Sequence, residues 1–173
     1  RSWYGPSELG LLVIKDKSLW SNPLPHLNAA HPNFEASLPL LLASAVAIEN
    51  FSSEVEEANM RARKFNSQLR DSFAQIPDVD IAGSLDSSLP HLLSASFLNC
   101  NGEELLRGIQ GDGFSVDSGS ACTADNLEPS HVLAAMGVLT HGNIRITIHP
   151  DATQSEIDGL ISSVKNNVER LRA

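Results

Sequence analysis

The sequence predicts a mixed α/β chain whose carboxy-terminal part is an α+β layer, in which strands alternate with helices that cover one side. Two observations support this fold class. The apolar residues keep a helical period up to Pro77 and then change to short, strand-like runs. The chain closes on its most regular helical pattern, where Thr153 and Glu156 form a capping box ahead of one apolar face: Ile157, Leu160, Ile161, Val164, Val168 and Leu171.

The amino-terminal elements follow from turn and capping signals. Residues 3–6 predict a turn, and the apolar residues 9–14 predict a buried strand. Residues 21–33 hold three prolines and predict a loop. Pro39 then opens an apolar helix that Ser37 is placed to cap and that runs to about Phe51. A second capping box at residues 53–56 predicts a second helix, which ends before Pro77.

The carboxy-terminal elements alternate. We expect strands at residues 79–82, 92–98, 114–116 and 143–149, and short helices at residues 101–110 and 129–136. In the last strand, Ile144 and Ile146 occupy one face while Arg145 and Thr147 occupy the other. The pattern therefore predicts a half-buried sheet, and alternation alone would place Arg145 on its solvated face.

Composition excludes several classes of protein. With 173 residues, the chain can form one domain with a core, or a small domain plus part of another. A net charge of −9, with the 12 basic residues spread along the chain, argues against binding to nucleic acid. The two cysteines, Cys100 and Cys122, lack metal-ligand spacing, so neither a metal site nor a disulfide framework is expected, and a reducing cytoplasm is favoured. Apolar runs such as residues 38–46 are too short to cross a membrane.

The segment around Cys122 is the most informative part of the sequence. Small residues flank the cysteine in the run Ser-Gly-Ser-Ala-Cys-Thr at positions 118–123, and a new helix signal follows. Few large side chains anchor such a segment to a core, whereas an inert thiol is usually placed among large apolar groups. The pattern predicts a thiol that moves and reacts, although most lone cysteines are not nucleophiles.

These residues resemble the active-site cysteine loop of the cysteine desulfurases, which are pyridoxal-phosphate enzymes of the class-V aminotransferase family. The resemblance rests on residues 118–123 together with Leu-Glu-Pro-Ser-His-Val-Leu at 127–133. It continues through Asn-Ile-Arg-Ile-Thr at 143–147 and through the start of the final helix at 153–158. Upstream, residues 4–6, 34–39, 90–94 and 101–106 are similar to the family in the same order.

The resemblance implies a fold, an activity and a set of site residues. The fold would be the carboxy-terminal part of a pyridoxal-phosphate-dependent transferase. Cys122 would attack the sulfur of bound L-cysteine, or of a similar amino acid, leaving a persulfide on the protein and releasing alanine. Arg145 would bind the substrate carboxylate. Ser37 would contact the cofactor phosphate across a dimer interface, or simply cap its helix, and His91 would stand behind the site.

The resemblance also implies a division of the chain. Residues 1–37 would be the end of the large cofactor domain, residues 38–76 connecting helices, and residues 77–173 the small domain with the cysteine loop. The longer protein would be a cytoplasmic homodimer that hands sulfur to an acceptor protein, as in iron–sulfur cluster assembly, without contacting nucleic acid or a membrane.

Three positions depart from the family pattern. Ser2 occupies the position of the family's cofactor-binding lysine, Arg1 that of the histidine before it, and Asn33 that of an arginine. A serine can neither bind the cofactor as an imine nor act as an amine base. We therefore expect the chain by itself to be inactive, and two alternatives stay open: a non-catalytic binding or scaffold module, and a sulfur carrier that receives a persulfide on Cys122.

Overall fold

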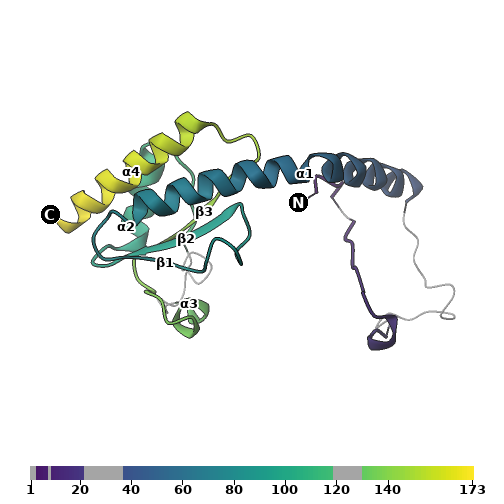
Figure 1. Cartoon of the computed structure of the whole chain (residues 1–173), viewed down its shortest axis with the longest axis horizontal. Coiled ribbons are helices and arrows are strands. Elements are labelled where there is room, and N and C mark those ends of the chain that lie inside the picture. Colours follow the sequence, from purple (N-terminus) through teal and green to yellow (C-terminus); the bar gives the residue numbers. More distant parts are fainter. Residues whose placement is uncertain (1–2, 8, 22–36, 119–129) are drawn as a thin grey trace. The chain divides into compact units, whose positions relative to one another are not determined.

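The computed structural model describes residues 3–7, 9–21, 37–118 and 130–173. The chain divides into two compact units, which we call unit 1 (Arg1–Glu56) and unit 2 (Glu57–Ala173). Helix α1 (Leu38–Phe73) begins in unit 1 and ends in unit 2 (Figure 1). The domain boundaries expected from the resemblance, after residues 37 and 76, stay a prediction.

Unit 1 differs from the sequence-based expectation at residues 9–14. This segment is not a strand, and its apolar side chains are largely exposed, with 68% of Leu12 and 86% of Val13 accessible to solvent. The prediction of a buried strand was therefore wrong for this chain. A fully buried strand needs hydrogen-bonding neighbours, and the described part of unit 1 contributes only α1 and the short 3-10 helix η1 (Lys17–Leu19).

Helix α1 is one helix of 36 residues instead of the two that were expected. The serines that suggested a break are accommodated within it, because Ser53 Oγ donates to the carbonyl of Asn50 at 2.7 Å. By length and composition alone α1 could cross a membrane, a test that the core helices of soluble proteins also pass. The apolar run at residues 38–46 is too short to span a membrane, whereas α1 as a whole is long enough. The expectation that the protein does not contact a membrane therefore stays a prediction.

Unit 2 is built on a three-stranded antiparallel sheet with strand order β1-β2-β3. Its strands are β1 (Val79–Ile81), β2 (Leu92–Phe97) and β3 (Asn143–Thr147). In their pairing, Leu93 lies opposite Ile146 and Ala95 opposite Ile144. The strand expected at residues 114–116 does not form, and among the described residues only an isolated bridge between Asp117 and Arg145 extends the sheet beyond β3.

Helices cover one face of this sheet. The carboxy-terminal half of α1, helix α2 (Gly102–Gly111) and helix α4 (Gln154–Arg172) pack on it, as the teal and yellow ribbons of Figure 1 illustrate. The shared core contains Leu69 and Phe73 from α1, Phe97 from β2 and Val164 from α4, all fully buried. The mixed α/β fold class predicted from the sequence is confirmed, and it leaves the second face of the sheet free of these helices.

A buried amide fixes the chain between β1 and β2 against α1. Asn66 is fully buried, and its Nδ2 donates to the carbonyls of Pro90 and Leu92 at 3.0 and 2.8 Å. Its Oδ1 accepts from Arg70 Nε at 2.9 Å, and Arg70 in turn donates to the carbonyl of Gly83. This network holds the start of β2 in place.

Replacing Asn66 with alanine should therefore lower the free energy of unfolding by about 1–3 kcal/mol, because buried carbonyls lose their donor. Urea unfolding followed by circular dichroism measures the change. Glu57→Ala, at an exposed position of the same helix, is the matched control and should change stability little. Equal effects of the two substitutions would contradict the role of Asn66 in holding the start of β2 against α1.

The capping box of α4 makes stability depend on pH. The backbone N–H of Thr153 and then its hydroxyl, each 2.8 Å from Glu156 Oε2, lower the pKa of Glu156 below its ordinary value. A lowered folded-state pKa stabilises the fold above the unfolded-state pKa, and this stabilisation is lost as the pH falls through the folded-state pKa. Glu156→Gln should thus unfold with a free energy that falls less steeply on acidification, as urea titrations across the acid range will test. An unchanged acid dependence would argue against this role.

Candidate functional site

The candidate site lies in unit 2 around Arg145, on the face of the sheet opposite to helices α2 and α4. Ile144 and Ile146 turn into the core, so Arg145, between them on β3, projects from the opposite face and is half exposed. On β2 its pairing partner is Ser94. The alternation predicted from the sequence is confirmed, and it places the guanidinium outside the helix-covered core.

Asp117 is the main described partner of Arg145. The two residues exchange both backbone hydrogen bonds, with Asp117 N donating to Arg145 O at 3.0 Å and Arg145 N to Asp117 O at 2.6 Å. Their side chains also form an ion pair, in which Arg145 Nη2 donates to Asp117 Oδ2. The bridge thus brings a carboxylate onto the guanidinium that was predicted to bind the carboxylate of the substrate.

A row of polar groups continues from Arg145 across the same face. Asn143 Nδ2 donates to Ser94 Oγ and Ser96 Oγ, each at 2.9 Å, and Asn143 is almost fully buried. Gly142, just before it, has a φ of +63° and lies so close to the carbonyl of Phe97 that a Cβ would meet that oxygen at 2.2 Å. A glycine is needed there to bring Asn143 against β2.

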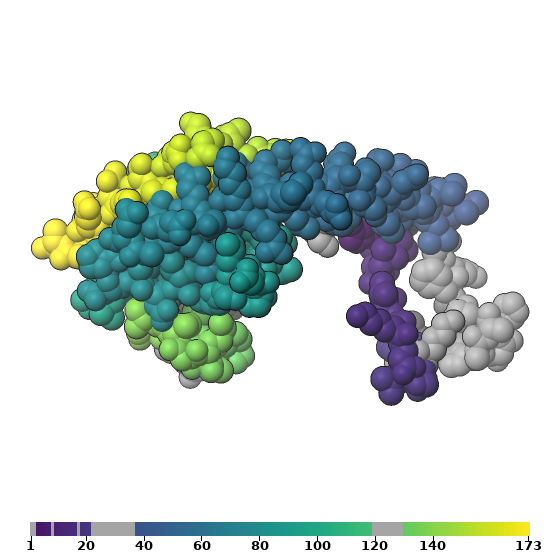
Figure 2. Space-filling model, in the orientation of Figure 1, coloured from purple at the N-terminus to yellow at the C-terminus, as the bar shows by residue number. Residues whose placement is uncertain are grey.

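The described chain on both sides of the segment that carries Cys122 contacts the sheet. At one end, Ser118 directly follows Asp117 and is buried. At the other, Ser130 caps helix α3 (His131–Ala135), and the chain after α3 is tied to the sheet. There Ser96 Oγ donates to the carbonyl of Leu139 at 2.7 Å, and the N–H of Leu139 donates to Asp80 Oδ2 at 2.9 Å. Figures 1 and 2 show α3, in green, on the side of unit 2 away from the yellow α4.

The structure locates some of the predicted site residues and not others. Cys122 and Ser2 lie outside the described residues, as does Asn33, so their roles stay predictions. Ser37 is exposed in unit 1, where its carbonyl accepts from the N–H of Leu41 at 3.1 Å at the start of α1. His91 is partly buried before β2, and its carbonyl accepts from the N–H of Ile148.

Sequence reasoning missed Asp117 and the polar partners of Asn143. The alternation of Ser94 and Ser96 with buried residues of β2 carried a signal, because it marks a polar face next to that of Arg145. No local sequence signal marked Asp117, because its pairing with Arg145 joins positions that are 28 residues apart. Cys100 is a free cysteine and is buried.

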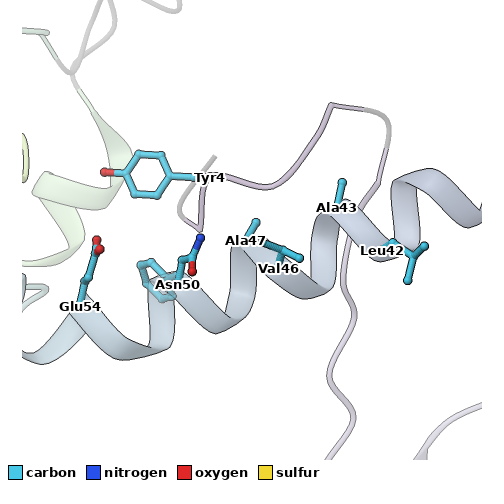
Figure 3. Close-up of a pocket in the computed structure, with 8 residues that line it drawn as sticks. Tyr4, Leu42, Ala43, Val46, Ala47, Asn50 and Glu54 are labelled. Atoms are coloured by element: carbon cyan, nitrogen blue, oxygen red, sulfur yellow. The ribbon is translucent and has the colours of Figure 1, made fainter.

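Unit 1 contains a separate hollow of about 650 Å³ along α1. Tyr4 faces the side of α1 that carries Ala43, Ala47, Asn50 and Glu54 (Figure 3). Its lining contains a carboxylate but neither a lysine nor an arginine. A phosphate-bearing ligand needs a cation or several N–H donors, and this lining offers the side-chain amide of Asn50 and no cation, so the hollow is poorly suited to one.

The residues that the structure describes do not fit the pyridoxal phosphate that the resemblance implies. The chain has four lysines: Lys15, Lys17, Lys64 and Lys165. In unit 2, Lys64 and Lys165 belong to α1 and α4, the helices on the face of the sheet opposite to Arg145. With Ser2 at the position of the family's lysine, Ser37 is the single predicted cofactor contact that the structure describes, and it offers a hydroxyl for a phosphate and nothing for the ring.

Curated relatives match nearly the whole chain. It is 32% identical to the cysteine desulfurase IscS of Ruthia magnifica over 176 aligned residues, 98% of this chain and 43% of that protein. It is 33% identical to IscS of Methylococcus capsulatus and 30% identical to IscS of Methanosarcina thermophila, and it covers 43% of each. The chain thus spans less than half the length of these relatives. No protein-family model matches it.

Solved structures agree with these relatives. A NifS-like protein superposes with a TM-score of 0.62 at 30% identity, over 79% of this chain and 34% of that one. The cysteine desulfurase CsdA from Escherichia coli, with an S-sulfonic acid, gives a TM-score of 0.61 at 22% identity over the same share of this chain, a likeness that concerns the fold alone. By sequence and by fold, the chain belongs to the cysteine desulfurase family of IscS and NifS proteins, of which it represents a part.

Proposed function

We propose that this chain is the sulfur-accepting part of a cysteine desulfurase, in which Arg145 binds the carboxylate of the amino acid and Cys122 takes up its sulfur. The observation that carries the proposal is the bridge between Asp117 and Arg145, because it ties the predicted carboxylate-binding arginine to the chain just before the Cys122 segment. Cys122 is five residues from Asp117, a reach of at most about 18 Å.

The overall reaction balances without an external oxidant or reductant. L-Cysteine and the Cys122 thiol give L-alanine and a Cys122 persulfide: the carbon–sulfur bond breaks, a sulfur–sulfur bond forms, and the electron pair left on carbon takes up a proton. The family uses pyridoxal phosphate as the electron sink for such chemistry. Because the described residues do not fit that cofactor and Ser2 replaces the family's lysine, we propose that residues outside positions 1–173 complete the site.

Arg145 suits a carboxylate because its planar guanidinium can donate two parallel hydrogen bonds to one. The polar residues next to Arg145 stabilise its position. Asn143 donates hydrogen bonds to two serine hydroxyls of β2, which holds β3 against β2. A half-exposed arginine on the open face of a sheet can meet a small amino acid without opening the core.

The 173-residue chain, mixed with pyridoxal phosphate and L-cysteine, should release no alanine above the level of a blank. It should also retain no cofactor absorbance after gel filtration, because Ser2 supplies no amine to hold the cofactor. Alanine assay and absorbance spectroscopy test both points, with the cofactor in buffer as the blank. Cofactor-dependent alanine release by the purified chain would contradict the proposal that other residues complete the site.

A second candidate function is sulfur transport without desulfuration. It is favoured by Ser2, because a protein without the lysine could still receive a persulfide on Cys122 from another enzyme. Mixing the chain with a separate, active cysteine desulfurase and L-cysteine distinguishes the two. Sulfur on Cys122 only when that enzyme is present supports a carrier, whereas a native protein that forms the persulfide unaided supports the desulfurase.

A further inference from the structure

The ion pair between Asp117 and Arg145 has a chemical consequence for ligand choice. If Arg145 binds substrate carboxylates, as in the proposed function on which this inference rests, then Asp117 is a resident carboxylate in the same site. The bridge fixes the backbone of Asp117 directly opposite Arg145, so its side chain is held near the guanidinium. Any other carboxylate must compete with it.

The geometry of the pair allows that competition. The described contact uses one oxygen of Asp117 and one terminal nitrogen of Arg145, Nη2. An incoming carboxylate that engages the guanidinium with both oxygens forms a stronger contact than this single-oxygen pair. Asp117 and Arg145 are 45% and 51% exposed, and exposed ion pairs of this kind contribute little and are readily replaced.

A displaced Asp117 still acts on the ligand. Its backbone hydrogen bonds to Arg145 keep the carboxylate close to the bound molecule. A ligand with a carboxylate alone is then repelled by a like charge, whereas an α-amino acid brings an ammonium group that the same charge attracts. The net effect is selection for α-amino acids over simple carboxylates.

We propose that Asp117 is a specificity-determining residue: it weakens the binding of simple carboxylates to Arg145 and permits the binding of α-amino acids. Asp80, another carboxylate on the sheet, is not part of the proposal. It lies on β1, at the other edge of the sheet, and accepts a hydrogen bond from the N–H of Leu139.

The test is a binding titration on the isotope-labelled 173-residue chain, followed through the amide NMR signals of Asn143 and Arg145. The probes are propionate and L-alanine, which differ by the ammonium group, at matched ionic strength. In Asp117→Asn, propionate should bind about 5-fold more tightly, the effect of removing one like charge at about 4 Å in water. L-Alanine should change by less than about 2-fold, because loss of repulsion and loss of attraction offset each other.

Glu103→Gln is the matched control, because it releases Arg107 from an exposed ion pair on α2, remote in function from the site. It should leave both affinities unchanged. Asp117→Ala provides a second variant at the site should the asparagine side chain form a new hydrogen bond, and the rest of the amide spectrum reports whether each variant is folded. Unchanged or weaker propionate binding in both Asp117 variants, or equal tightening of both probes, overturns the proposal.

Arg145→Gln separates this inference from the proposed function. If it abolishes propionate binding while the Asp117 variants fail to tighten it, Asp117 is not a selector but Arg145 keeps its role. If Arg145→Gln leaves propionate binding unchanged, the carboxylate does not bind at Arg145, and the proposed function falls together with the inference.

Discussion

Phe97→Ala is expected to lower the free energy of unfolding by about 3–5 kcal/mol, the usual cost of removing a buried phenylalanine side chain. Phe97 is fully buried in β2 and meets the ring of Phe73 edge-on, with the ring centroids 5.8 Å apart. It therefore joins the sheet to the carboxy-terminal half of α1. Chemical denaturation of the two proteins gives the difference.

The control for this substitution is the neighbouring Leu98→Ala. Leu98 is 39% exposed, so its truncation should cost clearly less. A cost for Phe97→Ala below about 1 kcal/mol, or one no larger than that of Leu98→Ala, would mean that the described core does not hold unit 2 together.

Cys122→Ser is expected to abolish sulfur uptake by the chain. When the wild-type chain is exposed to cysteine persulfide, the Cys122 thiolate takes the outer sulfur and releases cysteine, which leaves a protein persulfide. A serine hydroxyl cannot do this, because it is far less nucleophilic and forms no stable bond to sulfane sulfur. Peptide mass spectrometry should find one added sulfur atom on the peptide with residue 122 in the wild type and none in the variant.

Cys100 provides an internal reference in the same experiment. It is buried, so its thiol should stay unmodified in the folded chain and react only after unfolding. Equal modification of Cys100 and Cys122 in the folded protein would show that position 122 has no special reactivity, and would favour the scaffold alternative.

Local signals predicted the parts of the fold that depend on local interactions. The capping box of α4 forms as expected, with Thr153 and Glu156 bonded to each other, and the residues of its apolar stripe enter the core. The alternation around Arg145 was sufficient to place its strand and its face. The contacts of the capping box lie within one helix, and the two-residue repeat of a strand decides which face each side chain of β3 takes, so the local sequence is sufficient for both.

Where the expectations were wrong, the result depends on neighbours in space. Residues 9–14 have the apolar composition of a buried strand, but a strand forms only against partners, and the described chain provides none there. The break expected near Ser53 did not occur, because an interior serine can bond to the preceding turn of the same helix.

The candidate site shows the same division. A motif was enough to single out Cys122 and Arg145, since the reaction requires a thiol and a carboxylate-binding group. Asp117 was not predicted, because its contact with Arg145 arises from a bridge between distant segments. The residue that we propose to control ligand choice is therefore visible only in the fold.

In the proposed function, sulfur from L-cysteine arrives on Cys122. The most direct measurement supplies the protein, purified from its native cells with whatever completes its site, with L-cysteine that carries isotopically labelled sulfur. Peptides are then mapped by mass spectrometry while alanine is counted. Labelled sulfur should appear on the Cys122 peptide together with released alanine. Alanine release with the label absent from Cys122, or labelled sulfur on Cys100 instead, would contradict the proposed function.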